Sequence, residues 1–131
     1  MALSSRRTLA LALLPITVAV SSCLVAAGAA AGSGIYFTTR GVESIMQGSV
    51  DQVTGTVTQA FERLGVRHKG RRDGDSGREI YGLSGGHDVT VELRRETAHA
   101  TRVEVRVRKS AVAWDKEMAK RILEEIDSLR G

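Results

Sequence analysis

The sequence predicts an α+β fold, in which a four- or five-stranded antiparallel sheet carries two amphipathic helices on one face. Two late segments, Asp88–Arg95 and Thr101–Lys109, alternate apolar and polar residues, as strands with one buried face do. Two further segments repeat apolar residues at steps of three and four, which is the pattern of helices that cover such a face. A length of 131 residues suits one hydrophobic core and is too short for two.

The folded domain is expected to occupy residues 40–131, because the first charge after the N-terminal leader falls at its start. Its first element is predicted within residues 41–47. There Val42, Ser44 and Met46 alternate with Glu43, Ile45 and Gln47. This alternation is compatible with a short strand, and a helix remains an alternative.

A helix is expected next. Ser49 and Gln52 form the capping-box pattern that opens helices, and Gly65 suits the left-handed residue that ends them. Between these signals the apolar residues share one face: Val50, Val53, Val57, Ala60, Phe61 and Leu64. The intrinsic helix propensity of this segment is poor, so packing on that face must stabilise it.

Four further strands are predicted over residues 66–72, 78–83, 88–95 and 101–109. In the last two, the apolar set is Val89, Val91 and Leu93 together with Val103, Val105 and Val107. The opposite face carries Glu92, Arg94, Arg102, Glu104, Arg106 and Arg108. A slip of one residue would expose all six apolar side chains, so the sheet is expected to have one buried and one solvated face.

The last predicted element is a second helix that begins after Asp115, a good N-cap residue, and continues to about Leu129. Its apolar stripe consists of Met118, Ala119, Ile122, Leu123, Ile126 and Leu129. Both helices can therefore bury their stripes against the apolar face of the sheet, which gives one core.

Residues 1–22 have the layout of a secretory signal peptide. Arg6 and Arg7 supply the positive start, and Leu9–Val20 is an apolar run too short to span a bilayer unaided. These two arginines also account for half of the formal charge of +4, so the rest of the chain is close to neutral. The sequence as a whole therefore lacks the large positive excess typical of nucleic-acid binding.

The only cysteine of the chain, Cys23, follows this leader directly, and one cysteine excludes a disulfide framework. Val20-Ser21-Ser22-Cys23 resembles the lipobox of bacterial lipoproteins. The resemblance implies cleavage before Cys23, a diacylglycerol on its sulfur and usually an N-acyl chain, and two or more chains anchor a protein stably. Leu24 stands where aspartate would retain such a protein in the inner membrane, so the resemblance implies the outer membrane.

Residues 23–39 are rich in glycine and alanine and predict a tether, with Tyr36 and Phe37 as aromatic residues at the lipid surface. Two alternatives stay open. Leader and tether together are long enough for an uncleaved span, and Gly28 and Gly32 have the spacing by which such spans assemble into oligomers. The arginine pair also partly matches a twin-arginine export signal, which changes the route and not the destination.

The chain after the cysteine ends its first helix with Leu64-Gly65 and has a late strand that reads Thr-Arg-Val-Glu-Val-Arg-Val at 101–107. Together with the lipobox and the Gly/Ala stretch, these features resemble a family of small uncharacterised bacterial lipoproteins. The resemblance implies a small α+β domain and brings no known activity. The sequence departs from that family at Trp114, where glycine is usual, and at Ala119, where serine is usual.

One pattern points to catalysis. Gly82-Leu83-Ser84-Gly85-Gly86 matches the Gly-x-Ser-x-Gly nucleophile motif, which needs a helix after the serine, whereas a strand is expected here. We therefore interpret it as a turn, and a hydrolase using Ser84 is the least favoured alternative. His68, His87 and His99 lack the spacing of metal ligands, so neither a metal site, a cofactor nor a catalytic residue is predicted.

The most prominent electrostatic feature is a basic cluster of five residues: Arg63, Arg67, Lys69, Arg71 and Arg72. Arginine forks suit phosphate and carboxylate oxygens, so the cluster is a candidate for docking on anionic lipid, lipopolysaccharide or an acidic envelope protein. It contains no aromatic residues on which bases could stack, which argues against nucleic acid. Taken together, the sequence predicts an outer-membrane lipoprotein that faces the periplasm and acts as a non-catalytic binding or scaffolding module.

Overall fold

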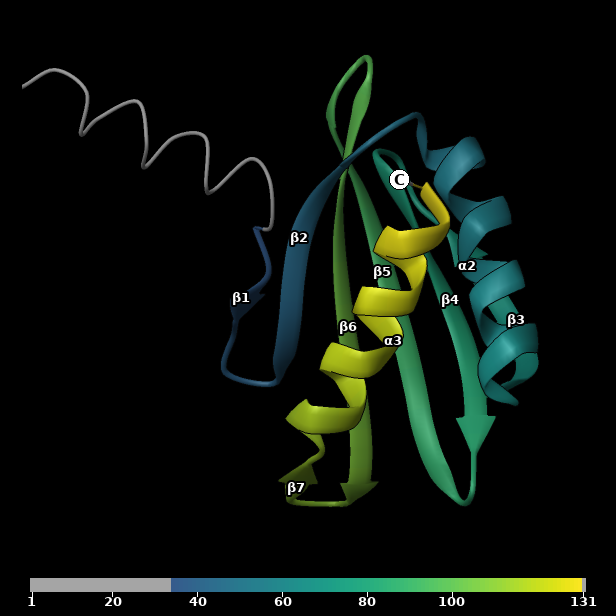
Figure 1. Ribbon diagram of the computed structural model, residues 1–131, viewed down its shortest axis with the longest axis vertical. Helices are drawn as coiled ribbons and strands as arrows, with labels where there is room; N and C mark the ends of the chain where they lie inside the picture. Colours follow the sequence, from purple (N-terminus) through teal and green to yellow (C-terminus); the bar gives the residue numbers. More distant parts are fainter. Residues whose placement is uncertain (1–33, 131) are drawn as a thin grey trace, which may run out of the picture. The chain divides into compact units, whose positions relative to one another are not determined.

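Two helices lie side by side on one face of an antiparallel sheet in the computed structural model of the protein (Figure 1). The structure describes residues 34–130. The predicted signal peptide of residues 1–22, Cys23 and the first part of the predicted tether lie outside the described residues. The α+β class and the placement of both helices on one face are confirmed.

In the described part of the chain the sheet has seven strands. The elements are β1 (Tyr36–Phe37), β2 (Gly41–Gln47), α2 (Val50–Leu64), β3 (Arg67–Asp73), β4 (Gly77–Ser84), β5 (His87–Thr97), β6 (Ala100–Ser110), β7 (Ala113–Trp114) and α3 (Lys116–Arg130). The strand order is β1-β2-β6-β5-β4-β3, with β7 also paired to β6, and every neighbouring pair is antiparallel. Helix α2 therefore carries the chain across the sheet from β2 to the opposite edge, and β3 to β6 return to β2 as a meander.

The number of strands corrects the prediction of four or five. Five long strands are present, and the two additional ones, β1 and β7, are two residues each. Such short strands carry no alternation of apolar and polar residues, so a sequence pattern cannot reveal them. Strand β1 pairs with β2 and takes Tyr36 and Phe37, which the sequence analysis assigned to the tether, into the sheet. Residues 41–47, for which the sequence left a helix open, form strand β2.

The core lies between the helices and the apolar face of β2, β4, β5 and β6 (Figure 1). Val89 pairs with Val107, Val91 with Val105, and Leu93 with Val103, in the predicted register. All six are at most 1% exposed, and Phe61, Ile122, Leu123 and Ile126 of the helices are equally buried against them. The two polar residues buried in the β2–β6 pair are Ser44 and Thr101, and the Thr101 hydroxyl donates to the Gly48 carbonyl.

The predicted helix ends are also confirmed. The Gln52 amide donates to the Ser49 hydroxyl while the Gln52 side chain accepts from the Ser49 amide, which completes a capping box. Gly65 ends α2 in the left-handed conformation with φ 74°. At the start of α3, the Met118 amide donates to the Asp115 carboxylate at 3.0 Å.

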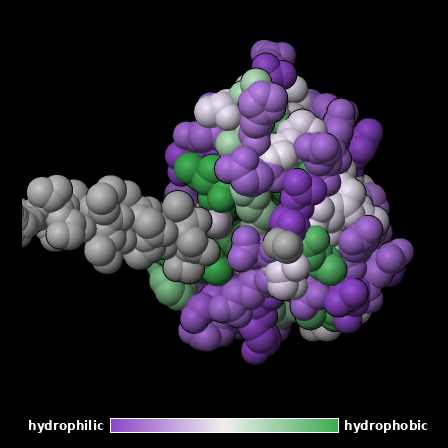
Figure 2. All heavy atoms as spheres, turned by 45° about the horizontal axis from the view of Figure 1, so that its top comes forward, coloured by the Kyte–Doolittle hydropathy of each residue, from purple (hydrophilic) through white to green (hydrophobic). Residues whose placement is uncertain are grey.

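Charged and polar side chains cover most of the surface at the end of the sheet that holds the β5–β6 turn, and apolar residues form separate patches (Figure 2). The exposed large apolar side chains include Tyr36 and Phe37 on β1 and Ile45 on β2. Among the described residues, neither helix is long and apolar enough to cross a membrane.

Replacing Ser49 with alanine tests the capping box. The substitution removes the acceptor of the Gln52 amide, so we expect the free energy of unfolding to fall by about 1 kcal/mol. Urea denaturation of the full chain measures it. Ser128→Ala is the matched control, because that exposed side chain only donates to the Glu125 carbonyl, and its effect should stay within about 0.5 kcal/mol. Equal effects of the two substitutions would contradict the role of the cap.

Candidate functional site

The face of the sheet opposite the helices is covered by no other element of the described chain. Its side chains form rows across the strands, because directly paired residues of antiparallel strands share a face. Four glutamates form one such row: Glu43 pairs with Glu104, Glu104 with Glu92, and Glu92 with Glu79. Like charges in directly opposed positions destabilise a sheet, so this row needs compensation from neighbouring rows.

Arg106 supplies most of that compensation. Its guanidinium contacts carboxylate oxygens of three of the four glutamates, at 2.9 Å for Glu104, 3.1 Å for Glu92 and 3.6 Å for Glu79. Only 12% of its side chain is exposed. The fourth glutamate, Glu43, accepts from Arg102 at 3.0 Å. Two arginines thus hold the row together, one from each adjacent row.

Glu79 shows the electrostatic consequence. The Tyr81 hydroxyl donates to its carboxylate, and this hydrogen bond is the main cause that holds the pKa of Glu79 below its ordinary value. The hydrogen bond from Arg72 and the charges of Arg72 and Arg106 lower the pKa further, against the opposing effect of burial. Glu79 is therefore ionised in the folded protein at neutral pH.

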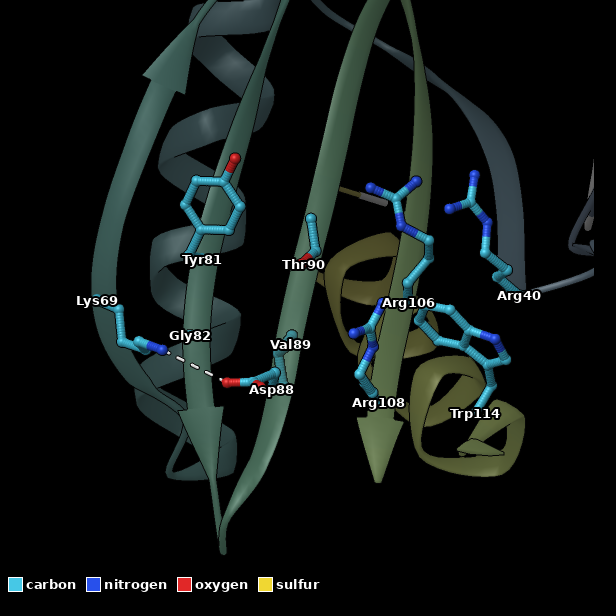
Figure 3. Close-up of a pocket in the computed structure, with 10 residues that line it drawn as sticks. All are labelled: Arg40, Lys69, Tyr81, Gly82, Asp88, Val89, Thr90, Arg106, Arg108 and Trp114. Carbon is cyan, nitrogen blue, oxygen red and sulfur yellow. Dashed lines mark hydrogen bonds and ion pairs between the residues drawn. The ribbon is translucent and has the colours of Figure 1, made fainter. Parts of the chain in front are cut away.

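Beside the glutamate row, toward the β4–β5 turn, the open face holds a hollow of about 530 Å³ (Figure 3). Its walls come from five strands and from the β1–β2 turn, and they are formed by Arg40, Lys69, Tyr81, Gly82, Asp88, Val89, Thr90, Arg106, Arg108 and Trp114. Four of these side chains are cationic and one, Asp88, is acidic. In Figure 3, Arg40, Arg106, Arg108 and Trp114 gather at one side of the hollow, and Lys69 and Tyr81 stand at the other.

Trp114, the last residue of β7, lies at the side of the hollow where Arg40 of the β1–β2 turn and Arg108 of β6 gather. Its ring centroid is 4.9 Å from the Arg108 guanidinium carbon and 5.9 Å from that of Arg40, both within the range of a cation–π contact. Strand β7 places it there, because Trp114 pairs with Arg108 of β6. Among residues 34–130, neither Arg40 nor Arg108 has a carboxylate oxygen within 4.0 Å.

A comparison with protein families matches residues 7–128 to a family described as "Protein of unknown function (DUF3568)". The match covers nearly the whole chain. The protein belongs to this family. No curated protein matches the sequence. Since the description of the DUF3568 family names no activity, the chemistry of the side chains has to supply the functional argument.

The structure divides the basic cluster that the sequence singled out in this DUF3568 protein. Arg63 lies on α2 and contacts Glu125 of α3 at 3.5 Å, so it joins the two helices. Arg72 contacts Glu79 at 2.8 Å on the open face. Arg71, one residue earlier, pairs with the buried Ile80 and so belongs to the opposite face.

The other two members of the cluster, Arg67 and Lys69, lie on the same face and at the same end of the sheet as Arg108. Arg67 pairs with Leu83, which in turn pairs with Asp88, and Asp88 pairs with Arg108. Lys69 contacts Asp88 at 3.4 Å and lines the hollow. The five residues therefore do not form one patch, and of the five only Lys69 lines the hollow.

The Gly-x-Ser-x-Gly pattern is a hairpin turn, as the sequence analysis interpreted it. Ser84 ends β4, and Gly85 and Gly86 have φ values of 55° and 86°, which suit a two-residue turn between antiparallel strands. Strand β5 follows in place of the helix that a nucleophile elbow requires. The first glycine has a packing role, because a Cβ atom on Gly82 would lie 2.6 Å from a methyl carbon of Val66 and 2.9 Å from the ring of Phe61.

Sequence reasoning missed Arg40 and Trp114 as parts of a site. Arg108 was correctly placed on the wet face of β6, but nothing in the local pattern connects it to a turn 68 residues earlier or to a two-residue strand. The available signals were that Trp114 is the only tryptophan of the chain and departs from the glycine usual in the resembled family.

Replacing Arg106 with glutamine tests the compensation of the glutamate row. It leaves three partly buried carboxylates without their shared cation, so we expect the free energy of unfolding at pH 7 to fall by about 2–3 kcal/mol. Arg94→Gln is the matched control. The Arg94 side chain is half exposed and approaches only Glu92, at 3.8 Å, so its loss should change stability by at most about 0.5 kcal/mol.

The stability loss caused by Arg106→Gln is expected to depend on pH. Because the folded-state pKa of Glu79 is lowered, its contribution to stability is complete above the ordinary pKa of glutamate and is lost as the pH falls through the lowered value. Part of this contribution is already missing in Arg106→Gln. The stability difference from the wild type should therefore narrow between pH 7 and about pH 3 in urea titrations. A difference that stays constant would contradict the electrostatic origin of the effect.

Proposed function

We propose that this protein is a lipid-anchored component of a bacterial envelope whose domain acts as a non-catalytic binding or scaffolding module for an anionic partner. The single observation that carries the binding role is the hollow on the open face, where Arg40 and Arg108 flank Trp114 without carboxylate partners among residues 34–130. A cationic, partly aromatic hollow on an uncovered face is a binding surface for anions.

The anchor is proposed from the sequence. The leader of residues 1–22 and the lipobox-like Val20-Ser21-Ser22-Cys23 support lipidation of Cys23 and, with Leu24, a periplasm-facing position at the outer membrane. Ten residues lie between Cys23 and Gly34, and at full extension the segment from Cys23 to Gly34 reaches about 40 Å. A tether of that length would keep the hollow close to lipid headgroups and to other proteins of the same membrane.

The chemistry of the hollow supports binding over catalysis. Arginine stays protonated in proteins, so Arg40, Arg106 and Arg108 cannot act as general bases. The carboxylate of the lining, Asp88, is exposed and contacts Lys69. The Tyr81 hydroxyl donates to the Glu79 carboxylate, which Arg72 and Arg106 also contact, and Ser84 ends β4 before a hairpin turn.

Mass spectrometry of the purified full-length product tests the anchor. We expect a mature chain that begins at Cys23 and carries a diacylglycerol on its sulfur, and a Cys23→Ser variant that keeps its leader and takes up no labelled acyl chain. Ser22→Ala is the matched control and should still be acylated, because the lipobox tolerates small residues at that place. An uncleaved wild-type chain with a free thiol would refute the anchor and favour the single-span alternative that assembles through Gly28 and Gly32.

A tethering assay tests the anion-binding surface. The lipidated protein is reconstituted into phosphatidylcholine vesicles, and light scattering records whether these vesicles associate with a second population that contains phosphatidylglycerol. We expect association that disappears at high salt, because screening weakens contacts between exposed charges. The double variant Arg40→Gln/Arg108→Gln should lose most of it.

The triple variant Arg67→Gln/Arg71→Gln/Arg72→Gln is the comparison in that assay. It removes one more positive charge than the double variant, yet it should have the smaller effect, because Arg72 is already paired with Glu79 and Arg71 faces the other side. A larger effect of the triple variant would move the surface to β3, and association by all variants alike would refute it.

A further inference from the structure

We infer that the hollow on the open face is a specific site for a phosphomonoester, bound by the guanidiniums of Arg40 and Arg108. The inference rests on the proposed anion-binding function and names its ligand class. Three properties of the lining lead to it: the charge that remains after internal pairing, the donors that remain after internal bonding, and the size of the hollow.

The remaining charge is two. Among the cations of the lining, Arg106 is neutralised by the glutamate row and Lys69 is offset by Asp88. Arg40 and Arg108 keep their full charges, since no described carboxylate lies within 4.0 Å of either. A phosphomonoester carries about −1.5 to −2 at neutral pH, whereas a phosphodiester or a single carboxylate carries −1. The doubly charged ligand matches the site best.

The remaining donors are the N–H groups of both guanidiniums. A cation–π contact uses the face of the guanidinium or its charge and leaves the N–H groups in the plane of the fork for hydrogen bonds. Contact with Trp114 therefore restrains Arg40 and Arg108 without consuming their donors. Because Trp114 is held by its pairing with β6, the two forks are positioned before a ligand arrives, which lowers the entropy lost on binding.

The size of the hollow indicates that the phosphate is part of a larger molecule. A volume of about 530 Å³ lies within the range of small-molecule sites and far exceeds one phosphate group. Beyond the arginines the lining offers the hydroxyl of Thr90 and the ring of Tyr81, which are suited to contact the hydroxyl groups and C–H groups of a glycerol or sugar. The same chemistry could be presented by a lipid headgroup or by a soluble metabolite, and the experiment below separates these sources.

The only tryptophan of the chain lies in the site, so its fluorescence reports binding directly. The full-length lipidated protein in neutral detergent micelles is titrated with glycerol 3-phosphate, with dimethyl phosphate as the singly charged phosphodiester and with succinate as the dicarboxylate, at constant ionic strength. We expect a saturable change with glycerol 3-phosphate at a dissociation constant at least tenfold below those of the two other anions.

Three variants locate the site. Arg40→Gln and Arg108→Gln should each raise the dissociation constant about tenfold or more, because each removes a charge-assisted hydrogen bond. Arg95→Gln, an exposed arginine at the other end of the sheet, should leave it unchanged. Thermal unfolding monitored by circular dichroism confirms that each variant is folded, and Arg108→Lys, which keeps the charge and loses the fork, should bind with intermediate affinity.

A second arm assigns the source. The protein is reconstituted into phosphatidylcholine vesicles with or without phosphatidic acid, whose headgroup is a phosphomonoester. A fluorescence change with phosphatidic acid that Arg108→Gln abolishes supports a lipid ligand, and a response to glycerol 3-phosphate alone supports a soluble one. Equal affinity for succinate and glycerol 3-phosphate would overturn the phosphomonoester assignment and leave an anion-binding module. No response to any of the three anions would overturn both.

Discussion

Val91 of β5 lies opposite Val105 of β6, and the register that this pair belongs to determines both faces of the sheet. On one face it aligns six buried aliphatic side chains under the two helices. On the other it places Glu92 opposite Glu104 and brings the Arg106 guanidinium, from the next row, into contact with both carboxylates. Because side chains alternate along a strand, a shift of this register would rearrange the side chains on both faces at once. The hydrophobic core and the charged surface of this protein are therefore consequences of one pairing.

On the charged face, two arginines each bind several glutamate carboxylates. Four glutamates in one row carry more negative charge than adjacent strands tolerate, and Arg106 and Arg102 are each bound by two or more carboxylates. These arginines are consequently committed to the fold. The same logic separates the cations of the β4–β5 end, where carboxylates are few, from those of the glutamate row. Arg40 and Arg108 contact an indole ring and no described carboxylate, and this difference supports the proposed binding role of the hollow.

The turn that contributes Arg40 to the hollow is close in sequence to the proposed anchor. Arg40 belongs to the turn between β1 and β2, only six residues after Gly34, the first residue that the structure describes. Strand β1 ties this turn to the edge of the sheet through its pairing with β2. If the segment before it is lipidated as proposed, the cationic hollow and the anchor are joined by a short stretch of chain, which suits a module that binds ligands near a membrane surface.

The sequence by itself determined four of the five long strands and both helices, the caps at Ser49, Gly65 and Asp115, and the division of β5 and β6 into a buried and a charged face, while it left β2 open between strand and helix. These features depend on local periodicity and on neighbours a few residues apart. Only the tertiary structure decided the rest. It added β1 and β7, which are too short to have a pattern, and it set β2 beside β6.

The site belongs to this second group. The basic cluster was conspicuous in the sequence because its members are close along the chain, but strand alternation and ion pairs with distant carboxylates, such as Arg63 with Glu125, disperse it. The hollow combines residues from the β1–β2 turn, from β3 to β6 and from β7, and no local sequence pattern relates these segments. Local sequence records which residues can pair, whereas the charge left unpaired is known only when every partner has a position in space.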